Sequence, residues 1–311
     1  MRFFDLHCDT IYRIINEDGS LYKNNFDVSI NKAKKYDKWI QSFAIWVPDE
    51  LRGEKAVSFF KKAIETFEAE IEKNNNFIMQ INEGKDLEEI LSTTKRGAVL
   101  TIENGAAIGG DIQNLYYASA HGTKMMTLTW NGRNEIGDGA LVEDSKGISD
   151  FGREVISEMN KLSMTIDVSH ASDRLFYDVI NLSTAPVIAT HSNSREICPN
   201  KRNLTKEQFE LIRDMGGIVG INFHRDFLNV SGKADFWDVF KHVDYFMEHG
   251  GEKTICIGSD FDGADLPECL CDIKYIEELY NYFKKMGYTE ELLDNIFFNN
   301  AYNFFKRNKL K

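Results

Sequence analysis

The chain of 311 residues has only four prolines, no long apolar run and an excess of acidic over basic side chains. No Pro/Gly/Ser-rich stretch marks a linker, so we expect a single domain over residues 1–311. The formal net charge of −12 argues against nucleic acid or an anionic membrane as a partner. No segment has the length of a membrane span, and no basic segment followed by an apolar stretch opens the chain. A cytoplasmic protein without a membrane partner is therefore expected.

Cysteine is scarce and scattered. The five cysteines lack the spacing of a zinc ribbon or of a redox motif, so reduced thiols are expected. Cys269 and Cys271 could form a metal pair, but loop or packing positions are the favoured interpretation.

What the chain does contain is a regular alternation of strand and helix patterns. Apolar, β-branched runs predict eight strands, at residues 3–8, 40–47, 97–102, 125–130, 164–169, 187–190, 218–223 and 254–258. Apolar residues at three- and four-residue intervals predict helices at 54–73, 113–121, 149–161, 172–182, 206–215 and 235–248. A short strand near 77–81 would extend the edge of the sheet, and two helices, about 272–286 and 289–305, would close the chain.

Eight strands separated by helices predict an α/β fold of the (β/α)8 TIM-barrel type. A doubly wound open sheet is the alternative. The first strand is not followed by a Gly-x-Gly-x-x-Gly or Walker-type loop, which weakens that alternative.

Polar or ionisable side chains stand at the ends of almost all of these strands. In a parallel α/β protein the active site is built at the carboxyl ends of the strands, and in a barrel those ends converge on one mouth. Residues with only a structural role would be scattered along the strands instead, so the pattern predicts a site. Its members are His7, Asp9, Glu103, Trp130, Asn131, His170, His191, Asn222 and Asp260.

Five of these residues could bind metal. His7 and Asp9 are two residues apart, so in extended backbone their side chains point to the same side. With Glu103, His170 and His191 they supply three imidazoles and two carboxylates. That set can hold two divalent ions if Glu103 bridges them. The alternative for Glu103 is a helix-capping role in the loop that follows it.

A bridged pair of ions lowers the pKa of a shared water, which makes hydroxide available, and polarises the carbonyl group under attack. The reaction then needs a group that accepts the proton of the water and returns it to the leaving atom. Asp260, at the end of the last strand, is placed for that task, although it could instead be a metal ligand. Asp262 is the alternative, but its position before Gly263 is typical of a turn residue.

Seven motifs carry a resemblance to a known family. They are Asp5-Leu-His7-Cys-Asp9, Thr101-Ile-Glu103-Asn-Gly, Leu128-Thr-Trp-Asn131, Asp167-Val-Ser-His170, Thr190-His191-Ser, Lys201-Arg-Asn203 and Gly258-Ser-Asp260-Phe-Asp-Gly263. In this order, and over nearly the whole chain, the set resembles the membrane dipeptidase (renal dipeptidase) family of the amidohydrolase superfamily, in its bacterial form.

The resemblance implies a (β/α)8 barrel with two zinc ions, Asp260 as the proton-transferring residue, and hydrolysis of dipeptides that often carry a D-residue at the C-terminal position. A homodimer is implied on the same ground alone. By resemblance, the first ion would be bound by His7 and Asp9, the second by His170 and His191, and both by Glu103.

The same resemblance places Arg202 where the family has an arginine that pairs with the terminal carboxylate of the substrate. A guanidinium can bind a carboxylate in a bidentate manner, which a lysine cannot do, and Lys201 is the alternative. Trp130 and Asn131 stand where the mammalian enzymes have a histidine, so either the metals suffice for the oxyanion or Asn131 donates to it. Phe227 stands where a tyrosine hydroxyl could help to hold the carboxylate.

The sequence therefore predicts a dipeptidase with two divalent ions and a bridging hydroxide as nucleophile, in which Arg202, Asn131 and Trp130 contact the substrate and His224 could line the pocket. Zinc fits the mixed ligand set, but manganese, cobalt or iron could occupy the same ligands. One alternative keeps the metals and changes the substrate to another small amide, a lactone or a β-lactam. A second alternative is a barrel without activity that serves as a binding protein. Such a barrel would usually have lost some of the ligands.

Overall fold

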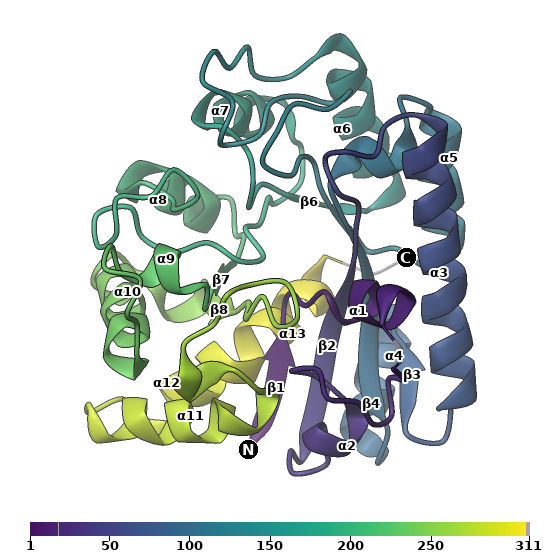
Figure 1. Cartoon of the computed structure of the whole chain (residues 1–311). Helices are drawn as coiled ribbons and strands as arrows, with labels where there is room; N and C mark the ends of the chain where they lie inside the picture. The colour runs from purple at the N-terminus through teal and green to yellow at the C-terminus, as the bar shows by residue number, and fades with distance from the viewer. Residues whose placement is uncertain (18, 309–311) are drawn as a thin grey trace.

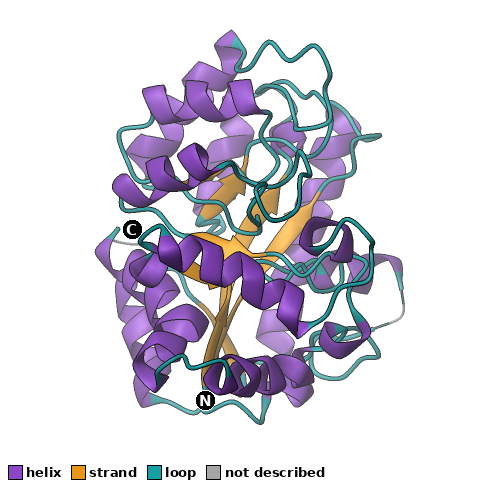
Figure 2. Cartoon of the chain, turned by 90° about the vertical axis from the view of Figure 1, so that its left-hand side faces the viewer, coloured by secondary structure: helices purple, strands orange, loops and turns teal. Residues whose placement is uncertain are grey.

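The computed structural model describes residues 1–17 and 19–308. Its centre is a parallel sheet in the order β6-β5-β4-β2-β1-β8-β7, with β3 paired to β4. Helices surround the strands, as Figure 2 shows. The strands are β1 Arg2–Asp5, β2 Lys38–Trp46, β3 Ile78–Gln80, β4 Arg96–Glu103, β5 Met125–Thr127, β6 Thr165–Asp167, β7 Val219–Ile221 and β8 Ile255–Ile257.

The structure corrects the strand predicted at 187–190. This segment forms only two isolated parallel bridges, Ile188 with Asp167 and Ala189 with Val219. The strand pairing ends here because the following backbone N–H groups donate to side chains instead of to a neighbouring strand. The N–H of Thr190, for example, donates to the carboxylate of Asp167 at 3.0 Å. The two bridges nevertheless join β6 to β7, so the segment closes the sheet, and the predicted (β/α)8 fold is confirmed.

The six helices predicted between residues 54 and 248 are present within a residue of their expected bounds, and side-chain caps define several of their starts. The helix predicted at about 272–286 begins only at Ile276, after a 3-10 turn, and the one predicted at about 289–305 is divided by a π-helical turn. Ser172, Thr205 and Asp235 accept backbone N–H groups at the first turns of α7, α8 and α10. The helices are α1 Thr10–Asn16, α2 Ile30–Ala33, α3 Glu54–Lys73, α4 Gly84–Ser92, α5 Ile112–Ala120, α6 Asp150–Leu162, α7 Asp173–Leu182, α8 Lys206–Asp214, α9 Arg225–Leu228, α10 Phe236–Glu248, α11 Ile276–Lys285, α12 Glu290–Asp294 and α13 Asn300–Arg307. Short 3-10 turns lie at Gly105–Ile108, Gly251–Lys253, Glu268–Leu270 and Ile273–Tyr275, and a π-helical turn, Asn295–Asn299, joins α12 to α13.

The last helical segment closes one end of the barrel. Phe298 and Phe305 pack on Phe4 of β1, with ring centroids 6.3 and 5.5 Å apart. The same buried cluster contains residues of β1, β2, β4, β5 and β8, and Ile188 of the closing segment. Figure 1 shows α13 in yellow beside β1. With its amino-terminal end filled by apolar side chains, the barrel can carry a polar site only at its carboxyl end.

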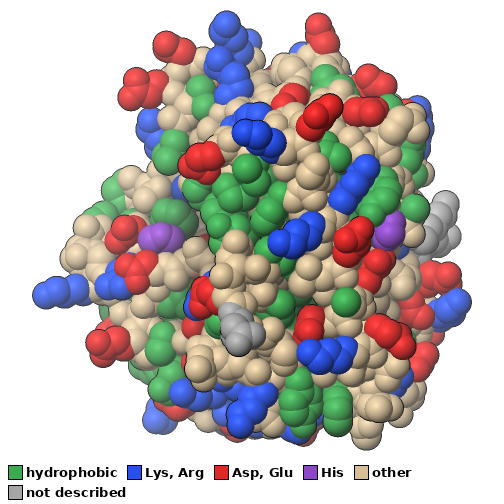
Figure 3. All heavy atoms as spheres, turned by 45° about the vertical axis from the view of Figure 1, so that its right-hand side comes forward, with side chains coloured by type: hydrophobic (Ala, Val, Ile, Leu, Met, Phe, Trp, Pro, Cys, Tyr) green, Lys and Arg blue, Asp and Glu red, His purple; other side chains and the backbone are tan. Residues whose placement is uncertain are grey.

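The outer surface bears on the expected partners. On the face in Figure 3, basic and acidic side chains are interspersed. Among the described residues, no helix combines the length and the apolarity needed to cross a bilayer. All five cysteines are free thiols, and the sulfur of Cys271 donates to the carbonyl of Glu268.

Candidate active site

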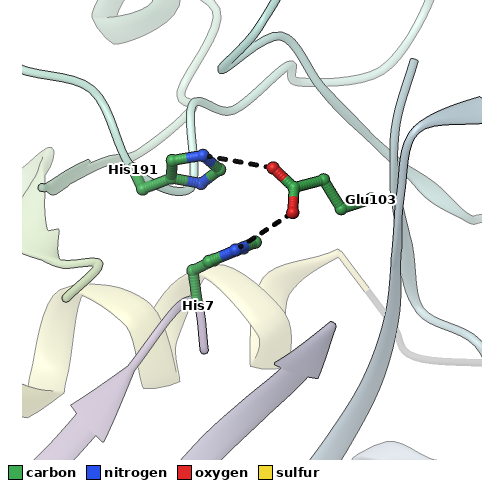
Figure 4. Close-up of side chains that lie close together, drawn as sticks. All are labelled: His7, Glu103 and His191. Carbon is green, nitrogen blue, oxygen red and sulfur yellow. Dashed lines mark ion pairs between the residues drawn. The ribbon is translucent and has the colours of Figure 1, made fainter. Parts of the chain in front are cut away.

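The five predicted metal ligands meet at the carboxyl end of the barrel. His7 and Asp9 follow β1, Glu103 is the last residue of β4, His170 follows β6, and His191 follows the closing segment. All five side chains are buried. Figure 4 shows His7 and His191 pointing at the carboxylate of Glu103 from two sides.

Glu103 lies between the two groups of ligands. Its Oε2 is 3.5 Å from Nε2 of His7, and its Oε1 is 2.8 Å from Nε2 of His170 and 3.6 Å from Nε2 of His191. On the first side, Oδ2 of Asp9 is 3.3 Å from Nε2 of His7. Each oxygen of Glu103 therefore faces a different set of ligands, which is the arrangement that a bridging carboxylate requires.

The ring nitrogens of His170 and His191 face each other, with 2.9 Å between the two Nε2 atoms. Nδ1 of His170 lies 3.0 Å from Oδ1 of Asn131, and Nδ1 of His191 lies 2.8 Å from the hydroxyl of Thr190. Because the Thr190 hydroxyl donates to Asp167 at 2.6 Å, it accepts from His191. Both Nδ1 atoms then carry the proton, so two bare lone pairs meet at Nε2. A cation bound by both nitrogens would remove their repulsion.

Buried aspartates hold the loops that carry these histidines. Asp167 accepts the hydroxyls of Thr127, Ser169 and Thr190 at 2.5 to 2.6 Å. On the other side of the mouth, Asp5 accepts the backbone N–H and the hydroxyl of Ser259 at 2.9 and 2.6 Å. Asp167 belongs to the motif Asp-Val-Ser-His, but the sequence does not indicate its role. The structure shows that Asp167 orients His191 through the hydroxyl of Thr190.

Two buried ligand atoms, Nε2 of His7 and Oδ1 of Asp9, have no hydrogen-bond partner. Two sets of donor atoms lie within 4.8 Å of one another: His7, Glu103 and His191, and His7, Asp9 and Asp260. Imidazole with carboxylate is a ligand set that zinc and related divalent ions accept. The residues at this mouth therefore fit divalent metal binding.

The protonation of these groups follows from their burial. Burial lowers the pKa of His170 and of His191 well below the ordinary histidine value, which favours the neutral imidazole that ligates metal. Burial also raises the pKa of Glu103 to about 7. Against the effect of its own burial, the carboxylates of Glu103 and Asp9 raise the pKa of His7.

Asp260 lies beside the ligands, and Asp262 does not. Oδ1 of Asp260 is 3.8 Å from Nε2 of His7, while its Oδ2 accepts the amide of Asn222 at 2.9 Å. The backbone of Asp260 is left-handed, with φ of 64°, and this strained conformation turns its side chain to the mouth. Asp262 instead accepts the Thr10 hydroxyl at 2.6 Å and a loop N–H at 2.7 Å, as a residue that shapes the loop.

Arg202 is buried, with a side chain that lacks partners. All three guanidinium nitrogens are without a hydrogen-bond partner, and the group lies 5.4 Å from the ring centroid of Phe227. Burial lowers the pKa of Arg202 to about 10. The neighbouring Lys201 is exposed. A buried guanidinium that has no hydrogen-bonded anion is suited to binding one.

A cavity of about 280 Å³ opens over the ligands. The side chains of Trp130, Asn131, His224 and Phe227 line it, so the prediction for His224 is confirmed. The Oδ1 of Asn131 is already engaged with His170. Three residues that the sequence analysis did not predict for the site also line the cavity, namely Tyr12, Arg13 and Trp46.

Comparisons with known proteins show similarity over nearly the whole chain. A family model described as "Membrane dipeptidase (Peptidase family M19)" matches residues 1–310. A protein of Klebsiella pneumoniae, known only as an uncharacterized protein in the pqqA 5' region, is 34% identical over 225 residues, which are 69% of this chain and 83% of that protein.

Solved structures share the fold. The dipeptidase AC, a metallo peptidase, superposes with a TM-score of 0.93 at 25% identity, over 99% of this chain and 98% of that one. A metallo peptidase from Rhodobacter sphaeroides, solved with a phosphinate mimic of the dipeptide L-Ala-D-Ala, gives 0.93 at 24% identity, over 99% of both chains. The probable dipeptidase PvdM from Pseudomonas aeruginosa gives 0.84 at 19% identity, over 99% of this chain and 95% of that one.

Proposed function

Because this chain belongs to the membrane dipeptidase family, peptidase family M19, and is therefore a metallo-dipeptidase, we propose that it cleaves dipeptides with two divalent ions, zinc in the first instance. One observation carries the proposal. The two oxygens of Glu103 face different ligand sets, His7 on one side and His170 with His191 on the other. A single-ion site would need no such carboxylate in the middle.

Bound there, divalent ions supply Lewis acidity toward the peptide carbonyl and make a water more acidic. His7 and Asp9 would hold one ion, His170 and His191 the other, and Glu103 both. Asn131 and Thr190 fix the two histidine rings through Nδ1, so that the Nε2 atoms stay available.

Asp260 would take the proton of the attacking water and deliver it to the leaving amine. Its Oδ2 is held by Asn222, which leaves Oδ1 toward the ligands and the cavity. Arg202 would bind the terminal carboxylate of the dipeptide, as an unpaired and buried guanidinium can. Trp130 and Asn131 line the cavity and would contact the substrate there. Because Oδ1 of Asn131 is engaged with His170, only its amide NH2 group is free to donate to an oxyanion. The tolerance for a D-residue at the C-terminal position belongs to the same proposal. It is supported by the similarity to the Rhodobacter sphaeroides protein, whose ligand mimics L-Ala-D-Ala.

A dipeptide-library assay on protein of known metal content tests this function. We expect hydrolysis of dipeptides that disappears on chelation and returns with zinc. Lactones and β-lactams are assayed in parallel, and turnover of these compounds without turnover of dipeptides would contradict the proposal. The cytoplasmic location, the single domain and the homodimer stay predictions, which fractionation, limited proteolysis and light scattering would test.

A further inference from the structure

Three aromatic side chains, Tyr12, Trp46 and Trp130, form a continuous wall of the cavity, here called the aromatic wall. Tyr12 belongs to α1, Trp46 ends β2 and Trp130 lies in the loop after β5. The Tyr12 and Trp46 ring centroids are 4.6 Å apart and those of Trp46 and Trp130 are 5.2 Å apart, both edge to face. Trp130 stands 6.2 Å from the ring of His170, so the wall begins beside the metal ligands.

Arg202 lies in the loop after the closing segment, with its guanidinium 5.4 Å from the ring centroid of Phe227, which lines the same cavity as the aromatic wall. Around the barrel, β2 and the closing segment before Arg202 are separated by β4, β5 and β6 in one direction and by β1, β8 and β7 in the other. Glu103 and His170 line the same cavity as the three rings. A dipeptide whose carboxylate is held by Arg202 would then extend across the ligands and bring its N-terminal residue to the wall.

We propose that the aromatic wall selects dipeptides with a large apolar N-terminal side chain, such as Phe or Leu, an inference that rests on the proposed function. The three rings are only partly buried, and they offer apolar area that such a side chain would cover. Tyr12 is supported from behind by Phe59, with ring centroids 6.0 Å apart. The wall is thus packed before a substrate arrives.

Aromatic faces can also attract cations, so the charge beside the wall decides between the two kinds of side chain. Arg13 lines the same cavity and follows Tyr12 in the chain. Its guanidinium is paired with both carboxylate oxygens of Glu17. A lysine or arginine side chain of a substrate would find Glu17 already bound by Arg13, and an acidic one would find Arg13 already paired. An apolar side chain meets neither difficulty.

The test measures kcat/KM of the zinc-loaded enzyme for Phe-Ala, Leu-Ala, Ala-Ala, Lys-Ala and Glu-Ala. We expect Phe-Ala and Leu-Ala to exceed Ala-Ala by about tenfold or more. Trp46→Ala should bring the ratio of Phe-Ala to Ala-Ala close to one, and Tyr12→Ala repeats the test on a different element. Trp237→Ala, which removes a half-exposed tryptophan on α10 outside the cavity, is the matched control and should keep the wild-type ratio.

The experiment gives different results if the inference fails and if the proposed function fails. If no dipeptide is cleaved, the proposed function itself is wrong. If dipeptides are cleaved but Lys-Ala or Glu-Ala equals Phe-Ala, or if the ratio survives both variants, the enzyme assignment stands and the role of the aromatic wall is refuted.

Discussion

Replacement of Arg202 tests whether its side chain serves substrate binding or the stability of the fold. Its guanidinium is buried and unpaired, and burial lowers its pKa to about 10. At about 1.36 kcal/mol for each pKa unit, keeping this group charged costs the fold on the order of 3 kcal/mol. Arg202→Met removes that charge and retains an apolar chain of similar length. We expect its free energy of unfolding to be unchanged or higher, by up to about 3 kcal/mol.

The same variant should lose most of its activity toward dipeptides. Removing one partner of a buried charge pair costs about 2 to 5 kcal/mol, which corresponds to roughly 30-fold to several-thousand-fold in kcat/KM. The loss should depend on the substrate carboxylate. The wild type should prefer a free dipeptide to its C-terminal amide, and Arg202→Met should lose this preference.

The assay compares kcat/KM for Phe-Ala and its amide, together with urea unfolding of each variant at one zinc concentration. Lys201→Met is the matched control, because Lys201 is adjacent and exposed, and it should keep the preference. The reasoning is refuted if Arg202→Met destabilises the protein by several kcal/mol and leaves the preference intact, or if Lys201→Met abolishes it.

Three further predictions address the proton carrier, the ligand loop and the pH dependence of stability. Asp260→Asn should keep both metals but lower kcat by about 10²- to 10⁴-fold. Steady-state kinetics together with metal analysis checks this prediction. Wild-type rates in the variant would show that another group carries the proton. A Cβ on Gly263 would lie 1.9 Å from Oδ2 of Asp9, so Gly263→Ala should lower metal content and activity. Gly84→Ala, with no atom within 4 Å of its Cβ, should change neither, and equal metal content in both variants would contradict the expected clash. Burial lowers the pKa of His242 to about 4, so its stabilising contribution is complete above the unfolded value of about 6.5 and is lost as pH falls toward 4. Between pH 7 and 5 the wild type should therefore lose about 2 kcal/mol more than His242→Gln in urea unfolding, and parallel losses would show that His242 is not held neutral.

The ligand set could be predicted from the sequence because a barrel brings the carboxyl ends of its strands together whatever the lengths of the connections. His7, Glu103, His170 and His191 needed only that rule, and all four meet at the mouth. The closing segment could not be predicted in detail. Its pattern is that of a strand, but Asp167 takes the backbone donor of Thr190, and this competition depends on tertiary contact.

The rest of the cavity was beyond sequence reasoning because loop conformation decides it. Nothing in the sequence indicates that Tyr12 and Trp46 face the ligands rather than the core, since an aromatic residue at a strand or helix position usually packs inside. Asn131 is predicted from the sequence as a substrate contact, and the structure adds a contact of its carbonyl oxygen with Nδ1 of His170 that the sequence does not indicate. The burial of Arg202 likewise depends on the conformation of the loop that carries it.

The central claim is that Glu103 bridges two ions. Anomalous diffraction at the zinc edge, from crystals grown with zinc, tests it most directly. The account predicts two peaks, one beside His7 and Asp9 and one beside His170 and His191, each about 2.0 to 2.2 Å from an oxygen of Glu103. A single peak, or two peaks that Glu103 does not touch, would contradict it.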